Sequence, residues 1–153
     1  MKRSYEKMNK LNSVLGETAG LYRKLNILLD LSDSVSDILY LLYANDGCYP
    51  VRGLCMDLDI PKQTVNSALR RLEKEDILLL ETISGKKKRA VLTEKGKQFC
   101  DNAIAPIFQI ENSVFAEFSP SELETFITLH EKYNAVLGRH INDYGRAKNG
   151  REQ

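Results

Sequence analysis

The stretch from Ile60 to Glu75 constrains the fold more than any other part of the chain. Its apolar residues recur three and four positions apart, at Val65, Ala68, Leu69 and Leu72. That spacing places them on one side of an α-helix, because successive residues turn by about 100°. The pattern predicts a helix over residues 61–76 that buries this stripe on neighbouring helices, after a turn at Asp59-Ile60.

The opposite side of this predicted helix carries cations and small hydrogen-bonding residues. Gln63, Asn66, Ser67, Arg70 and Lys74 fall on that side, and the further DNA-binding candidates of this helix are Lys62, Thr64 and Arg71. An α-helix fits the major groove of DNA, where Gln or Asn suits adenine and Arg suits guanine. Gln63, Asn66 and Arg70 are therefore candidates for contacts to base edges.

Three residues of this helix are better suited to phosphates. Thr64, Ser67 and Arg71 can bind the DNA backbone, which orients a protein without reading the base sequence. The alternative is an ordinary solvated helix face. Such faces usually favour Glu and Lys, whereas the early positions here are small and form hydrogen bonds.

A basic turn follows the predicted helix. Strand-forming residues from Ile77 to Ile83 are followed by residues 88–92 across the turn Ser84-Gly85-Lys86, which predicts a β-hairpin. Four consecutive cations stand at its tip, namely Lys86, Lys87, Lys88 and Arg89. Beside a recognition helix, such a tip reaches a phosphate backbone or the minor groove. The alternative is a tip that is basic only for solubility.

Charge is distributed unevenly along the chain. The formal net charge of the 153 residues is only +1. Residues 61–100 hold ten Lys and Arg against five Asp and Glu, while residues 101–145 hold two against seven. A basic block beside an acidic remainder gives an oriented electrostatic surface that the total charge conceals.

Helical periodicity recurs on the N-terminal side. Residues 1–29 predict a helix, continuous or broken near Gly16, and residues 34–45 and 51–58 predict two short helices. Tyr49-Pro50-Val51 reads as an extended link between the short helices.

Two further helices are predicted on the C-terminal side. Thr93 is a suitable N-cap for a long helix that runs to about Phe118 and kinks at Pro106. Ser119 and Glu122 form a capping box for a last helix over residues 120–142. We expect the polar segment Gly145–Gln153 to fray.

Three segments resemble the multiple-antibiotic-resistance regulator (MarR) family of bacterial winged-helix transcription factors. They are Ile60-Pro61-Lys62-Gln63-Thr64-Val65-Asn66-Ser67, Leu72-Glu73-Lys74-Glu75 and Leu92-Thr93-Glu94-Lys95-Gly96. The resemblance covers about residues 10–142 and implies a mainly α (α+β) fold. It also implies one MarR-like domain over residues 1–153. A winged helix-turn-helix lobe would occupy residues 30–100, between dimerisation helices at 1–29 and 101–145.

The resemblance also implies a biological role. It predicts a homodimer whose first and last helices interlock, bound to double-stranded DNA at a pseudo-palindromic operator. The lack of an apolar run that could span a membrane separately predicts a cytoplasmic location. Such a regulator, most simply a repressor, often responds to a small-molecule effector bound between its lobes. The alternative is a winged-helix module that binds other proteins and never touches DNA.

Two positions depart from the family pattern. Many members carry Asp-x-Arg in the wing, where the Asp orients the Arg. Here the stretch from Ser84 to Arg89 has no Asp. The resemblance implies that Arg89 takes the role of that arginine. Asp76 stands where the family usually has Gly at the end of the recognition helix.

The residues themselves also predict a dimer, independently of the resemblance. The helices at 1–29 and 120–142 present apolar stripes that a small central lobe cannot cover, and pairing across a two-fold axis would bury them. The alternative is that both helices pack within one monomer. Four aromatic residues, Tyr22, Tyr40, Tyr43 and Phe108, either line an effector pocket or belong to the core.

Nothing in the sequence predicts an enzyme, a cofactor or a metal site. Neither His130 nor His140 lies in a motif with a cysteine, and no Gly-rich phosphate loop is present. Cys48, Cys55 and Cys100 lack metal-binding spacing, and we interpret them as small apolar residues, with redox sensing as the alternative. No apolar run is long enough to span a membrane.

Overall fold

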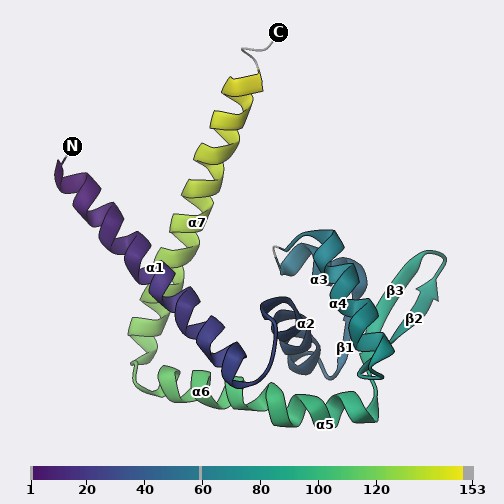
Figure 1. The fold of residues 1–153 in the computed structure, drawn as a ribbon. Coiled ribbons are helices and arrows are strands. Elements are labelled where there is room, and N and C mark those ends of the chain that lie inside the picture. Colours follow the sequence, from purple (N-terminus) through teal and green to yellow (C-terminus); the bar gives the residue numbers. More distant parts are fainter. Residues whose placement is uncertain (1, 59, 150–153) are drawn as a thin grey trace. The chain divides into compact units, whose positions relative to one another are not determined.

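The computed structural model describes residues 2–58 and 60–149 of the chain (Figure 1). Asp59, predicted in the turn before the recognition helix, and residues 150–153, predicted to fray, lie outside this part. The chain forms two compact units, Met1–Gln109 and Ile110–Gln153.

Most elements belong to the first unit. Its helices are α1 (Lys2–Leu28), α2 (Asp33–Ala44), α3 (Val51–Asp57), α4 (Lys62–Lys74), α5 (Glu94–Ala103) and the start of α6 (Ala105–Ala116). Its strands are β1 (Cys48–Pro50), β2 (Leu78–Ser84) and β3 (Lys87–Leu92). The mainly α fold with a small hairpin, as predicted, is confirmed. Helix α1 is continuous, so Gly16 does not break it.

The three strands form one antiparallel sheet in the order β1-β3-β2. The segment interpreted as an extended link is in fact the edge strand β1. Its register places Pro50 opposite Arg89, and Glu81 of β2 faces Arg89 from the other side. A proline is tolerated here because an edge strand need not donate every backbone N–H.

The core of the first unit lies between α2, α4, the sheet and α5. Its fully buried side chains include Ile38, Leu39, Leu42, Leu54, Val65, Leu69, Leu72, Leu78 and Ile104. The predicted stripe of α4 is therefore buried as expected, and α4 contacts α2, α3 and β2. Burying a Val or Leu side chain contributes about 1.5–3 kcal/mol, so this stripe holds α4 in place.

One helix of the sequence prediction is two helices in the structure. The predicted run from Glu94 to Phe118 breaks at Ile104, between α5 and α6. Pro106 explains the break, since it lacks an N–H and its ring clashes with the carbonyl four residues earlier. It stands instead in the first turn of α6, where the missing N–H costs little.

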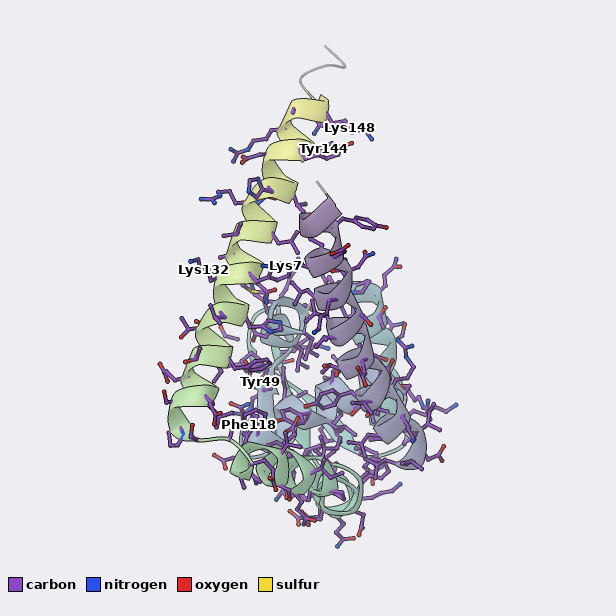
Figure 2. All side chains as sticks on the ribbon, turned by 90° about the vertical axis from the view of Figure 1, so that its left-hand side faces the viewer. Lys7, Tyr49, Phe118, Lys132, Tyr144 and Lys148 are labelled. Atoms are coloured by element: carbon purple, nitrogen blue, oxygen red, sulfur yellow. The ribbon has the colours of Figure 1, made fainter. Side chains whose placement is uncertain are left out.

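The second unit consists of the remainder of α6 and the long helix α7 (Pro120–Asn149). Its capping box is confirmed: the Ser119 backbone N–H donates to Glu122 Oε2 at 2.9 Å, and the Glu122 N–H donates to Ser119 Oγ at 3.3 Å. The helix continues through Gly145 to Asn149, so fraying from residue 145 was a wrong prediction. Among its described residues α7 buries none (Figure 2).

Candidate nucleic-acid interface

Helix α4 turns its polar side to solvent. All seven predicted site residues of this helix are exposed, namely Lys62, Gln63, Thr64, Asn66, Ser67, Arg70 and Arg71. Gln63, Asn66, Ser67 and Arg70 are exposed because they lie opposite the buried stripe of the helix. Lys62, Thr64 and Arg71 lie nearer the edges of that stripe. The surface that the sequence predicts is therefore present as one continuous helical face.

The two adjacent arginines of α4 differ in their partners. Arg71 donates from Nε to Glu75 Oε1 at 2.9 Å, one turn further along the helix. This hydrogen bond and the charge of Glu75 raise the pKa of Arg71 above its ordinary value. Arg70 forms no hydrogen bond or ion pair with any described residue, so its guanidinium is available to an external partner.

The wing is the β2–β3 hairpin, which projects beside α4 in Figure 1. Its turn lies at Gly85, in the left-handed region at φ 54°, where a residue without a Cβ is least strained. The side chains of Lys86, Lys87 and Lys88 are exposed and have no polar partner among the residues that the structure describes. Three lysines thus concentrate positive charge at and beside the turn.

Arg89 differs from the three lysines because it has an acidic partner. It lies further along β3 than Lys87 and Lys88, and both its Nε and Nη2 lie 2.8 Å from Glu81 Oε2. The hydrogen bond to Glu81 raises the pKa of Arg89 above its ordinary value. An acid on the facing strand β2 thus holds the guanidinium of Arg89. Sequence reasoning missed Glu81, although residues 81 and 89 are equally distant from Gly85.

The end of α4 adopts a hydrogen-bonded helix stop around Asp76. The N–H of Ile77 donates to the Leu72 carbonyl at 2.9 Å, and the N–H of Asp76 donates to that of Glu73 at 3.1 Å. This pair of bonds is the Schellman motif, which requires a left-handed residue. Asp76 provides it at φ 60°, because Asp tolerates this conformation better than most residues. The aspartate therefore occupies the left-handed position where helices usually end in glycine.

The segment Leu92-Thr93-Glu94-Lys95-Gly96 leads from β3 into α5, and its side chains form hydrogen bonds to the C-terminal end of α4. Thr93 Oγ1 accepts the Gly96 N–H at 2.9 Å, which confirms the predicted N-cap, and donates to the Asp76 carbonyl at 2.7 Å. Lys95 Nζ donates to the Glu75 carbonyl at 2.6 Å. Gly96 is required by space, since a Cβ there would lie 1.9 Å from the Ile77 carbonyl oxygen.

The cysteines form neither a disulfide nor a metal site. All three are free, and no group of three or more potential metal ligands occurs among the described residues. Cys48 and Cys55 are half-buried. Burial raises the pKa of the Cys100 thiol to about 12, so this thiol stays protonated and unreactive near neutral pH.

Three of the four singled-out aromatic residues pack together on the core. The rings of Tyr40 and Phe108 stack with centroids 4.3 Å apart, and Tyr43 lies 5.4 Å from Phe108. Tyr43 donates from its hydroxyl to Asp101 at 3.3 Å and borders an open depression of about 250 Å³. Ligand pockets usually enclose roughly 300–1,000 Å³, so we assign no effector site to this depression.

Comparison with known proteins finds solved structures whose fold is similar to that of this chain. No protein-family model and no curated protein matches the sequence. A solved MarR family regulator from Neisseria meningitidis matches with a TM-score of 0.81 over 90% of this chain and 97% of its own, at 19% identity. The chain has the MarR fold.

Other solved structures share the MarR fold. MepR from Staphylococcus aureus, in complex with DNA, has a TM-score of 0.65 at 18% identity, covering 84% of this chain and 96% of its own. MarR from the same organism, in complex with salicylate and kanamycin, also has a TM-score of 0.65 at 17% identity, covering 89% and 93%. Within residues 2–58 and 60–149, no helix is long and apolar enough to cross a membrane.

Proposed function

We propose that this chain is a sequence-specific DNA-binding transcriptional regulator of the MarR family. The observation that carries the proposal is the face of α4, which is exposed, rich in hydrogen-bonding groups and free of internal partners at Arg70. The unpartnered lysines of the adjacent wing add a second cationic element. The similarity in fold to a solved MarR family regulator supports the proposal.

In this proposal α4 enters the major groove and the wing contacts the backbone beside it. Gln63, Asn66 and Arg70 face base edges, and no internal bond needs to break first. Each good bidentate pair is worth about 1–3 kcal/mol of discrimination between bases. Lys86, Lys87 and Lys88 neutralise phosphates and give affinity that does not depend on sequence. Arg89, held by Glu81, lies about midway along the wing.

The same proposal includes a cytoplasmic homodimer. Helices α1 and α7 leave large apolar side chains exposed, among them Leu21, Phe126, Ile127, Leu137 and Ile141. Exposed apolar residues in such number are typical of an interface. A second copy of the chain covers them and duplicates α4, so the operator is a pseudo-palindrome with half-sites about 34–36 Å apart.

Repression and effector release complete the proposal. A dimer on a promoter excludes RNA polymerase, and a small molecule that favours another arrangement of the two α4 helices releases the DNA. Two proteins of the same fold support this view, since one was solved with DNA and another with salicylate and kanamycin. The single MarR-like domain over residues 1–153, without an enzymatic activity, belongs to the same proposal.

Selection of bound DNA from a random pool tests the function. The full chain should enrich an inverted repeat with half-site centres about 10–10.5 base pairs apart. A control chain with Arg70→Ala and with Lys86, Lys87 and Lys88 changed to Ala should enrich nothing. If the folded wild-type chain also enriches no sequence, DNA recognition is wrong and a protein-binding winged-helix module is the better interpretation.

A further inference from the structure

The C-terminal end of α4 is held by three donors from one short segment. Lys95 Nζ donates to the Glu75 carbonyl at 2.6 Å, and Thr93 Oγ1 donates to the Asp76 carbonyl at 2.7 Å. The Thr93 backbone N–H donates to the Ile77 carbonyl at 3.0 Å. Three successive carbonyls at the end of α4 therefore depend on Thr93 and Lys95 at the start of α5. We call this arrangement the α4–α5 corner.

Lys95 is the charged member of the corner. The carbonyls at the end of a helix carry partial negative charge, so an ammonium group there is favourable. Its partner is a backbone oxygen 20 residues earlier in the chain, and the close approach is possible because Gly96 has no Cβ to strike Ile77. Lys97, on the same helix, instead pairs with Glu94 at 2.6 Å. The two lysines of α5 thus bind different partners, Lys95 the end of α4 and Lys97 a carboxylate of its own helix.

The corner lies at the end of α4 remote from the early reading residues. Gln63 and Glu75 are twelve residues apart, which is about 18 Å along a helix with a rise of 1.5 Å per residue. A tilt of about 5° at the corner would therefore displace Gln63 by roughly 1.5 Å. A displacement of that size removes a hydrogen bond, because donor and acceptor must stay within about 3.2 Å.

We propose that Lys95 is a positioning residue for DNA recognition, which sets the direction of α4 from its far end without touching the DNA. The inference rests on the proposed function, because it concerns how the reading helix of that function is aligned. The three hydrogen bonds of the α4–α5 corner are the observation that supports this inference. Helix α5 provides the support, and Lys95 is the side chain through which α5 reaches the last turn of α4.

The experiment compares Lys95→Met with Lys97→Met in the full chain, with Lys95→Arg as the conservative variant. Both Met variants lose one positive charge from α5, but only Lys95→Met loses the contact to α4. Affinity is measured for the selected operator and for unrelated DNA of equal length, across a series of salt concentrations. Circular dichroism and thermal unfolding verify that each variant is folded at the assay temperature.

The expected result is a selective loss for Lys95→Met. Its operator affinity falls about two- to fivefold below that of Lys97→Met, in line with a cation at a helix C-terminus. Its affinity for unrelated DNA and its slope of log K against log salt match those of Lys97→Met. Lys95→Arg recovers most of the operator affinity, because a guanidinium can donate to the same carbonyl.

Four outcomes overturn the inference. Equal operator affinities for the two Met variants would show that the corner does not align α4. A salt slope shallower by about 0.9 in Lys95→Met alone would show that Lys95 contacts a phosphate instead. If Lys95→Met does not fold, Lys95→Gln replaces it, and an operator affinity equal to that of Lys97→Met counts against positioning. A wild-type chain that binds no DNA overturns the proposed function first, and this inference with it.

Discussion

Gly96 leaves no room for a side chain, so even the methyl group of alanine would prevent the close approach of α5 to the segment that follows α4. A Cβ at this position would lie 1.9 Å from the Ile77 carbonyl oxygen, and the obstructing atom is backbone that cannot rotate away. We expect Gly96→Ala to lower the free energy of unfolding by about 2–4 kcal/mol, as severe overpacking does. Denaturant unfolding measures the change.

Gly145→Ala is the matched control for Gly96→Ala. Gly145 also lies within a helix, but a Cβ there meets nothing within 4 Å. This substitution should be neutral or stabilise by up to about 1 kcal/mol, because Ala has the higher helix propensity. Equal effects of the two substitutions would mean that the tight approach at Gly96 does not exist in solution.

Arg70 and Arg71 offer a second residue-scale comparison. Arg70 has no partner among the described residues, whereas Arg71 is held by Glu75. Arg70→Ala should cost about 1–3 kcal/mol of operator binding and relax the preference at one base position. Arg71→Ala should weaken binding similarly for all sequences. Titrations against single-base operator variants decide, and an unchanged base preference in Arg70→Ala contradicts the assignment to a base edge.

At the scale of elements, the wing should act through charge alone. Replacing Lys86, Lys87 and Lys88 with Ala should lower affinity for operator and unrelated DNA alike. If all three contact phosphates, the slope of log K against log salt should become shallower by about 2.7. Replacing Lys7, Lys10 and Lys24 of α1 with Ala removes equal charge and is the control. An unchanged slope in the wing variant would show that the wing does not touch the backbone.

The start of α7 makes a pH-dependent contribution to stability. Hydrogen bonds from Ser119 lower the pKa of Glu122 below its ordinary value. A carboxyl with a lowered folded-state pKa stabilises above its unfolded pKa, and this stabilisation is lost as pH falls through the folded value. Ser119→Ala should therefore return the pKa of Glu122 towards the ordinary value for Glu, as followed by NMR titration. An unshifted Glu122 resonance curve in this variant would contradict the capping box.

Helices with strong local signals could be predicted, whereas elements defined by pairing could not. The capping residues Thr93 and Ser119 act on backbone groups three positions away, so the sequence reveals them directly. β1 has three residues and one proline, and exists because Cys48–Pro50 pairs with β3 about forty residues later. The break at Ile104 was predicted only as a kink, since a proline signals strain but not how far neighbouring packing will let two helices separate.

At the scale of the whole molecule, the unburied apolar side chains of α1 and α7 predict a dimer that DNA binding needs. Phe126→Glu places a charge on the apolar side of α7, and Thr128→Glu places the same charge on the opposite side. Only Phe126→Glu should shift the chain from dimer to monomer in sedimentation, with a loss of operator affinity. A monomeric wild-type chain, or equal sedimentation of both variants, would contradict the dimer.

The sequence by itself determined those features that depend on residues a few positions apart. The buried stripe and polar face of α4, the basic turn around Gly85 and the helix caps all follow from local periodicity and local hydrogen bonds. Only the tertiary structure decided the partners of Arg89 and Lys95. Glu81 holds Arg89 across two strands, and Lys95 reaches Glu75 across 20 residues. Strand register and close helix packing, which link residues distant in the chain, create these contacts, so no local pattern announces them.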